Sequence, residues 1–251
     1  MALIPQGRRA DLEDLGFDPG SYTCLLECAT RSAGIVVIIG PSGSGKRTTA
    51  DALARRAVTH GAPQPLLNEV TSSTTWSDAV RTASLGQPVI CTMAVPGIDS
   101  MRERMATFGT APGAGVGRIT AVVSQRLVRT ICVCCKKRVT GATGLLSDQG
   151  VDEAYMGHLD LSVARVDVES LREWKGAGCD RCASSGYRGV TGIFEVRRFI
   201  DGEEPLSPGG ATRMATGVGP GPGSLTLRDA GLRCVILGVT TMDEVRRVLA
   251  A

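Results

Sequence analysis

The sequence predicts an α/β fold in which helices flank a parallel sheet. A short β-branched run, Ile35–Ile39, lies between two glycines and indicates a buried parallel strand. A glycine-rich loop follows, and after Lys46 apolar residues recur at helical spacing. Val89–Met93 indicates a second buried strand. Strands that alternate with helices in this way are typical of parallel sheets.

Apolar residues at helical spacing predict further helices along the chain. One ends at Gly86, another follows the second strand, and a third ends at Arg129, just before the first cysteines. Near the C-terminus, Thr241 with Glu244 forms a capping box that predicts a last helix. The apolar faces are Trp76, Ala79, Val80 and Ala83; Ile98, Met101, Met105 and Phe108; Ile119, Val122, Val123 and Leu127; and Val245, Val248 and Leu249.

Composition limits the class of protein. The 251 residues are enough for one large or two small domains, and 43% hydrophobic residues fit a soluble globular chain. The net charge of +3 is too small to favour nucleic-acid binding. No apolar run approaches the roughly 18 residues that span a bilayer, and the first residues lack the apolar core of a signal peptide. We therefore expect a cytoplasmic protein without a transmembrane segment.

The loop after the first strand is typical of a phosphate-binding site. Gly40, Gly45 and Lys46 fit the pattern G-x-x-x-x-G-K, and the flanking strand and helix are the context that the motif requires. Backbone N–H groups would face phosphate oxygens, and Lys46 would reach the β- and γ-phosphates. The alternative is an ordinary glycine turn. The candidate nucleotide-binding residues are Gly40, Ser42, Gly43, Ser44, Gly45, Lys46, Arg47 and Thr48.

Arg47 departs from the motif, which has Ser or Thr at this position. The usual hydroxyl ligates Mg²⁺, whereas a guanidinium has no lone pair to offer and repels the ion. Thr48 is the next residue, but one step along a helix turns the side chain by about 100°. Our hypothesis is that Mg²⁺-dependent turnover is impaired while phosphate binding survives, because arginine binds phosphate well.

Four cysteines form two CxxC pairs, Cys132 with Cys135 and Cys179 with Cys182. A two-residue gap lets both thiolates of a pair face one ion, so we expect a structural Zn²⁺ site. Buried free thiols and a redox pair are the alternatives. The other cysteines are interpreted as a bystander, Cys134, and as small buried hydrophobes, Cys24, Cys28, Cys91 and Cys234.

Four longer stretches carry a family resemblance. They are LEDLGFD (12–18) with GIVVIIGPSGSGKRTTA, SQRLVRTICVCCK (124–136), GCDRCASSGYRGVTGIFEV (178–196) and SLTLRDAGLRCVILGVTTMDEVRRVL (224–249). Together they resemble the secretion ATPases, which are the type II secretion ATPase and the type IV pilus assembly ATPase. By this resemblance, the second stretch is a helix with the first zinc pair, and the third is the second pair with the following strand. The resemblance covers nearly the whole chain from residue 12 and corresponds to the family's C-terminal ATPase half.

The chain differs from the family mainly in the catalytic elements. NEV (68–70) stands where the family has the Gly-Glu-Ile of its Walker B core, so Glu69 is the candidate for polarising the attacking water and joins Lys46 as a catalytic candidate. The arginine that follows in the family is Thr71 here, and the histidine of the family's histidine box is Ala94. A long segment with acidic residues and arginines is missing before NEV. By comparison, the loop, zinc pairs and terminal helices persist.

The resemblance implies a P-loop NTPase-type parallel sheet with a small zinc-binding subdomain and C-terminal helices. It divides the chain into a lead-in segment (1–33), a shortened P-loop ATPase core (34–131), a tetracysteine zinc subdomain (132–200), a flexible Gly/Pro linker (201–224) and C-terminal helices (225–251). It also implies ATP and Zn²⁺ as cofactors, while Arg47 puts Mg²⁺ in doubt.

Three functions follow from these expectations. The first is a motor that powers type II secretion or type IV pilus assembly by ATP hydrolysis. By resemblance, it would work as a hexamer with inner-membrane secretion or pilus components, peripherally at the cytoplasmic face of the inner membrane. The second is a catalytically impaired nucleotide-binding or assembly module of the same family. The third is a zinc-ribbon nucleic-acid binder, against which the small net charge argues.

Overall fold

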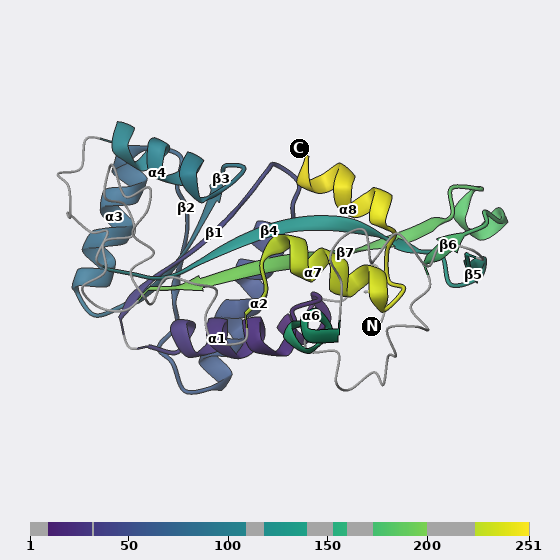
Figure 1. Ribbon diagram of the computed structural model, residues 1–251. Coiled ribbons are helices and arrows are strands. Elements are labelled where there is room, and N and C mark those ends of the chain that lie inside the picture. The colour runs from purple at the N-terminus through teal and green to yellow at the C-terminus, as the bar shows by residue number, and fades with distance from the viewer. Residues whose placement is uncertain are drawn as a thin grey trace.

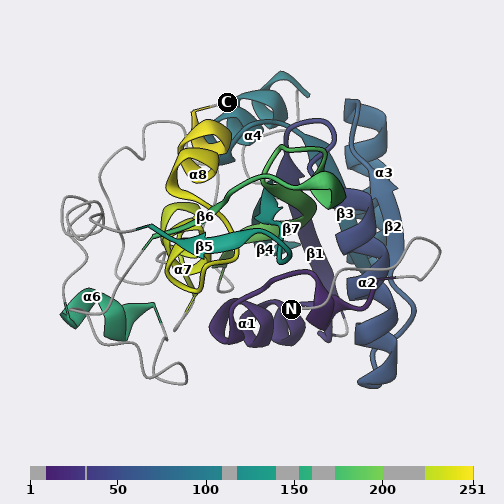
Figure 2. The same cartoon turned by 90° about the vertical axis from the view of Figure 1, so that its right-hand side faces the viewer.

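A five-stranded sheet forms the centre of the molecule (Figures 1 and 2). The computed structural model describes residues 10–31, 33–108, 118–139, 153–159, 173–199 and 224–250. The strand order is β2-β3-β1-β4-β7, with the first four strands parallel to their neighbours and β7 antiparallel to β4. The prediction of an α/β fold with a mostly parallel sheet is confirmed. The strands are β1 (Gly34–Gly40), β2 (Leu66–Glu69), β3 (Pro88–Ala94), β4 (Ile119–Ile131) and β7 (Tyr187–Arg198).

Helices cover both faces of the sheet, and the side chains of β1 contact both layers. Val36 and Ile38 belong to the hydrophobic cluster that contains α1 and α2. Ile35, Val37 and Ile39 belong to the cluster on the opposite face, with α3 and α4. This burial on both faces explains the unbroken apolar run in the sequence. The helices are α1 (Pro19–Ala29), α2 (Lys46–Thr59), α3 (Ser73–Ser84) and α4 (Ile98–Thr107), with a short 3₁₀ turn, η1 (Leu12–Asp14), before them.

Local sequence signals set the starts of two of these helices. Asp18 accepts a hydrogen bond from the backbone N–H of Ser21 at 2.9 Å, and Pro19 stands at the first position of α1. Ser72 and Thr75 form a reciprocal capping box at the start of α3. Such caps satisfy backbone N–H groups that have no partner within the helix. The predicted helices around 76–83 and 98–108 are confirmed as α3 and α4.

The predicted helix at Ile119–Arg129 is wrong, because this segment is the strand β4. It pairs in parallel with β1 on one side and antiparallel with β7 on the other. Residues 119–126 are all buried, so both faces carry buried side chains and no period-two alternation is visible in the sequence. The spacing of Ile119, Val122 and Val123 then mimics a helix. β-branched residues favour strands over helices, and that signal should have had more weight.

The far end of the β4–β7 pair carries a small second sheet and the C-terminal helices (Figure 1). The remaining elements are β5 (Lys136–Arg138), β6 (Trp174–Gly176), α6 (Glu153–His158), the 3₁₀ turn η5 (Asp180–Cys182), α7 (Leu227–Ile236) and α8 (Met242–Leu249). β5 and β6 pair antiparallel, and α7 and α8 pack on β4 and β7 around Val128 and Ile193. The division of the chain into five segments stays a prediction. The predicted linker 201–224 lies outside the described residues except for Ser224.

Glu244 joins α8 to the central sheet. Its carboxylate accepts hydrogen bonds from the backbone N–H of Arg129 at 2.9 Å and from the guanidinium groups of Arg129 and Arg247 at 2.7–2.9 Å. Burial works against ionisation, but these hydrogen bonds prevail and lower the pKa of Glu244 to about 2. Thr241 accepts a hydrogen bond from the N–H of Glu244 at the start of α8. Of the predicted capping box, the Thr241 half is therefore present, while the carboxylate of Glu244 binds the two arginines instead.

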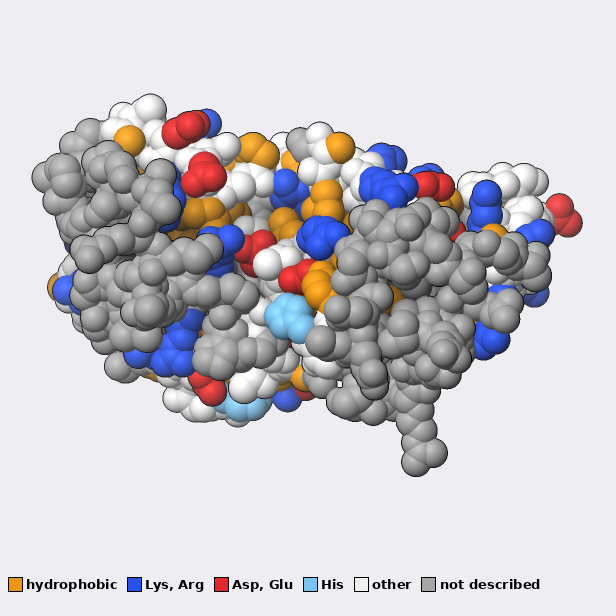
Figure 3. Space-filling view, viewed as in Figure 1, with side chains coloured by type: hydrophobic (Ala, Val, Ile, Leu, Met, Phe, Trp, Pro, Cys, Tyr) orange, Lys and Arg blue, Asp and Glu red, His pale blue; other side chains and the backbone are white. Residues whose placement is uncertain are grey.

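The surface carries charges of both signs. On the face seen in Figure 3, Lys, Arg, Asp and Glu side chains are interspersed with small hydrophobic areas. This agrees with a net charge of only +3. Among the helices that the structure describes, none has both the length and the apolar character needed to cross a bilayer.

We predict that Glu244→Gln lowers the free energy of unfolding by about 2 kcal/mol at pH 7, because a buried carboxylate that holds two arginines is lost. Urea denaturation would measure it. Since the folded pKa of Glu244 lies below its unfolded value, this stabilisation is present above about pH 4.5 and is lost as the pH falls towards 2.

The difference in the free energy of unfolding between the wild type and Glu244→Gln should therefore shrink as the pH is lowered. Glu27→Gln is the matched control, since Glu27 pairs with Arg198 at the surface and its loss should cost less than about 0.5 kcal/mol. Equal effects of the two changes would contradict the prediction.

Candidate functional site

The loop between β1 and α2 is shaped by close backbone contacts. Gly45 precedes α2 with a φ of 84°, in the left-handed region that favours glycine. At Gly40, an added Cβ would lie 2.5 Å from the carbonyl oxygen of Gln125 and 2.6 Å from Ser44 Oγ. The side-chain amide of Gln125 donates to the carbonyl of Ser44 at 2.6 Å. Through Gln125, β4 therefore fixes the position of the loop, and only glycine fits at residue 40.

Lys46 is the first residue of α2 and folds back over the loop. Its Nζ donates to the carbonyl oxygens of Gly40 at 3.0 Å and Pro41 at 2.8 Å. Burial lowers the pKa of the Lys46 ammonium, while the charge of Glu69 raises it and that of Arg126 lowers it further. The ammonium thus lies near one carboxylate and one guanidinium at the carboxyl end of the sheet.

A cavity of about 420 Å³ opens beside Lys46, and we call it the phosphate cavity. Most of the candidate residues meet here, including Glu69 from the end of β2 on the wall that faces α2. Gly40 and Ser44 do not line it, and Ser44 is buried beneath the loop. Its lining residues are Ser42, Gly43, Gly45, Lys46, Arg47, Thr48, Ala50, Asp51, Leu67, Asn68, Glu69, Ile90, Thr92 and Ala94.

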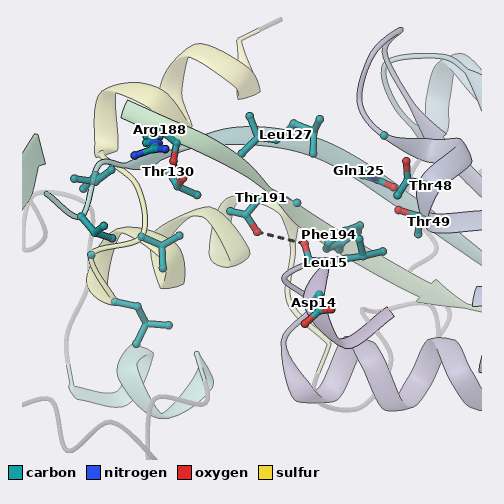
Figure 4. A pocket seen from close by; sticks show the side chains of 18 of the residues that line it. Asp14, Leu15, Thr48, Thr49, Gln125, Leu127, Thr130, Arg188, Thr191 and Phe194 are labelled. Carbon is teal, nitrogen blue, oxygen red and sulfur yellow. Dashed lines mark hydrogen bonds between the residues drawn. The ribbon is translucent and has the colours of Figure 1, made fainter. Parts of the chain in front are cut away.

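A second cavity of about 370 Å³, the side cavity, lies on the other side of the loop (Figure 4). It shares Gly45 and Thr48 with the phosphate cavity. Figure 4 shows Thr48, Thr49 and Gln125 gathered at one end, with Thr130 and Arg188 at the other. Its walls also include the apolar side chains of Leu15, Leu127 and Phe194.

Thr49 and Gln125 are site residues that the sequence analysis missed. Both are at most 2% exposed, and the hydroxyl of Thr49 and the side-chain carbonyl of Gln125 have no hydrogen-bond partner among the described residues. Buried polar atoms without partners are uncommon and mark a place for a polar ligand or water. The signal for Thr49 was its position in the first turn of α2. Gln125 was missed because its strand was predicted as a helix.

Mg²⁺ does not fit the loop in the usual way. Arg47 stands where the metal-ligating hydroxyl is expected, and its exposed side chain lines the phosphate cavity. A guanidinium offers five donors and no lone pair. The donor set therefore favours anions over a divalent cation at this position.

Arg126 lies on β4 and is buried. It is 7% exposed, and burial lowers the pKa of its guanidinium. Its Nη2 donates to the carbonyl of Pro96 at 2.5 Å and its Nη1 to the carbonyl of Gln125 at 3.1 Å. Arg129, three residues further along β4, is bound to Glu244.

The four predicted metal ligands come together at the end of the β4–β7 pair. The Sγ atoms of Cys132, Cys135, Cys179 and Cys182 all lie within 4.8 Å of one another. The Sγ–Sγ distances of the pairs Cys132–Cys179, Cys135–Cys182 and Cys179–Cys182 are 3.7–3.9 Å, which match the roughly 3.8 Å edge of a tetrahedron with metal–sulfur bonds of about 2.3 Å. These residues fit a tetrahedral metal ion.

The pKa shifts differ within this cluster: burial raises the pKa of the Cys135 thiol to about 12 and also raises that of Cys179, whereas the pKa of Cys182 is lowered. Burial opposes ionisation of Cys182, but hydrogen bonds from the N–H groups of Cys179 and Gly186 lower its pKa to about 6. Cys134 is exposed and lies outside the group of four. The interpretation of Cys24, Cys28, Cys91 and Cys234 as buried residues is confirmed.

The family described as Type II/IV secretion system protein matches residues 66–247 of the chain. The chain belongs to this family. The family resemblance found in the sequence is thereby confirmed.

Two curated members of this family and one solved structure are similar to the chain. The Type IV pilus assembly ATPase PilB of Thermus thermophilus is 27% identical over 278 residues, covering 94% of this chain and 30% of that protein. The Type II secretion system protein E of Pseudomonas aeruginosa is 27% identical over 292 residues, covering 98% of this chain and 54% of that protein. The X-ray structure of the Yersinia pseudotuberculosis ATPase DotB is 14% identical, with a TM-score of 0.50, and covers 96% of this chain and 63% of that chain.

The chain is shorter than the curated relatives that it matches. The chain spans about a third to a half of the two curated relatives. Both alignments are longer than the 251 residues of the chain, so the relatives carry internal residues that this chain lacks. The DotB likeness concerns the fold alone.

We predict that Gly40→Ala lowers the free energy of unfolding by about 1–3 kcal/mol, because the new methyl group would force the loop away from Gln125. Gly97→Ala is the control, since a Cβ there would meet nothing within 4 Å. Thermal or urea denaturation of both variants would decide. A Gly40 variant as stable as the Gly97 variant would show that the loop is not confined as described.

Proposed function

We propose that the chain is an ATP-binding protein of the secretion-ATPase type. The observation that carries this proposal is the phosphate cavity, where the loop, Lys46 and Glu69 converge at the carboxyl ends of parallel strands. Ligands of open α/β sheets bind at this edge, at the point where successive strands are added on opposite sides of a strand. Here that strand is β1, with β3 on one side and β4 on the other.

The two cavities suit the two parts of a nucleotide. The loop and the start of α2 would hold the phosphates through backbone N–H groups, and Lys46 would exchange its carbonyl partners for phosphate oxygens. The side cavity, which shares Gly45 and Thr48, would take the nucleoside between apolar walls that include Leu127 and Phe194.

Hydrolysis would use groups already in the phosphate cavity. Glu69 would accept a proton from a water molecule whose oxygen attacks the γ-phosphorus, while the bond to the β-phosphate oxygen breaks and yields ADP and phosphate. Lys46 would stabilise the negative charge that develops on the transferred group. The names of the relatives, PilB and secretion system protein E, support this reading, because they describe pilus assembly and type II secretion.

A second candidate function is favoured by Arg47 and Ala94. Both line the phosphate cavity at positions where the family's catalytic groups are expected from resemblance. In this reading, the chain binds nucleotide as an assembly module and turns it over slowly or not at all. In either case, we propose a hexameric, cytoplasmic protein that acts peripherally at the inner membrane with secretion or pilus components.

We propose that the tetracysteine cluster holds one structural Zn²⁺. The ion would supply a fourfold cross-link between the end of β4 and η5, joining segments more than forty residues apart in sequence. Backbone N–H groups favour the thiolate form of Cys182, which is the form that binds a metal ion, and this supports the proposal.

ATP binding and hydrolysis are tested together. Lys46→Ala should weaken ATP binding at least about tenfold, because it removes the cation at the loop. Glu69→Gln should leave binding within about threefold and lower phosphate release by about a hundredfold. Calorimetry and a phosphate-release assay would measure both.

Wild-type phosphate release equal to that of Lys46→Ala would reject hydrolysis and favour the second candidate. Unchanged ATP affinity in Lys46→Ala would reject the proposed site.

Zinc is tested by elemental analysis of the purified protein. We expect about one zinc per chain, loss of that zinc in Cys182→Ser, and retention in the control Cys134→Ser, because only Cys182 belongs to the cluster. The first variant should also melt at a lower temperature, since metal binding stabilises the fold. Zinc lost equally from both variants, or absent from the wild type, would contradict the assignment.

A further inference from the structure

Two cationic side chains line the phosphate cavity, and a third is held on β4 beside the loop. Lys46 and Arg47 begin α2 and line the cavity. Arg126 comes from β4 and lies close enough to lower the pKa of the Lys46 ammonium. Glu69 and Asp51 supply the carboxylates of the cavity wall and balance Lys46 and Arg47, so Arg126 adds a positive charge beyond that balance.

Arg126 is buried without a matching negative charge. Its guanidinium binds two carbonyl oxygens, its Nε has no hydrogen-bond partner, and no ion pair to it is found within the part of the chain that the structure describes. A buried charge is costly unless it is paired. Arg126 lies just beyond the carboxyl ends of β1 and β3, and its buried charge is satisfied best when an anion binds nearby.

The contacts of Arg126 also place it between the loop and the neighbouring strand. The carbonyl of Gln125 that it binds is the same group that crowds Gly40, and the carbonyl of Pro96 lies just beyond β3. Arg126 therefore links the backbone beneath Gly40 to the segment that follows β3. It acts on a bound phosphate through its charge and through the backbone that it fixes.

Arg47 adds a second guanidinium on the open side of the cavity. It stands where a metal-ligating hydroxyl is expected, and its planar donors suit bidentate contact with phosphate oxygens. A divalent cation at this position would face a fixed positive charge.

We propose that this site binds nucleoside triphosphates as metal-free anions, with Arg47 and Arg126 supplying the positive charge that Mg²⁺ supplies at other phosphate loops. The inference rests on the proposed function, because it takes a nucleotide as the ligand. It concerns the binding step alone and holds for a hydrolysing and for a non-hydrolysing protein. Arg47 contacts the phosphates, and Arg126 is a positioning residue.

The test is calorimetric titration of ATP into the full-length protein with and without millimolar MgCl₂. The buffer is freed of divalent ions on a chelating resin before the protein is added, because a soluble chelator could strip the cysteine cluster. We expect the Kd for ATP without Mg²⁺ to stay within about threefold of the value with Mg²⁺.

Variants separate the two guanidinium groups. Arg47→Ser restores the hydroxyl, so metal-free ATP affinity should fall about tenfold and Mg²⁺ should recover it. Arg126→Gln should weaken ATP binding more than AMP binding, and Arg126→Lys should recover part of the loss. Arg81→Ser is the control, because Arg81 pairs with Asp78 on the surface of α3.

Each outcome decides the proposal. A wild-type affinity that falls tenfold or more without Mg²⁺ overturns it and leaves nucleotide binding intact. An Arg47→Ser variant that behaves like the Arg81→Ser control also overturns it. If ATP binds in neither buffer, the proposed function and this inference are both overturned. If Arg126→Gln fails to fold, as circular dichroism would show, the wild-type and Arg47→Ser titrations carry the decision.

Discussion

The antiparallel pairing of β4 with β7 holds the parts of this molecule together. The first half of β4 lies beside β1 and brings Gln125 and Arg126 to the phosphate loop. Its second half continues beyond β1, where β7 is its strand partner, and ends at Ile131, just before Cys132. The register, which sets Ile131 opposite Tyr187, places the segment before β7 next to the first CxxC pair. A single long strand thus connects the candidate nucleotide site, the C-terminal helices and the cysteine cluster.

Strand pairing also explains why a 43-residue gap does not keep the cysteine pairs apart. The backbone N–H of Ala177 donates to the carbonyl of Cys135 at 2.9 Å, and β5 pairs with β6, so the two ends of the intervening segment lie side by side. Closing such a loop costs conformational entropy, which a strand ladder and a metal ion can offset together. Loss of the proposed ion would therefore act first on the end of the strand pair and only indirectly on the phosphate loop.

The sequence predicted the first strand, the phosphate loop, the helix after it and the cysteine cluster because each has a strong local signal. The loop motif names its own residues, and CxxC spacing needs no knowledge of the fold. The strand β4 was mispredicted because burial on both faces removes the alternation that identifies a strand. That error concealed the positions of Gln125 and Arg126 beside the loop. Residues such as Asp51 and Thr92 join the cavity through the register of neighbouring elements, which one sequence does not reveal.

The hydrogen bonds of Lys46 to its own loop have a thermodynamic consequence. The ammonium already has two carbonyl partners, on Gly40 and Pro41, so an incoming phosphate must compete with the protein for the same donor. Two existing hydrogen bonds of Lys46 would have to break before it could bind phosphate, so the enthalpy of binding would be smaller than the number of new contacts suggests. The affinity measured for any anion would also include the free energy of opening the loop. If the site binds phosphate as proposed, binding would require rearrangement of an internally satisfied loop, and the measured affinity would be weaker than that of a site whose donor is already free.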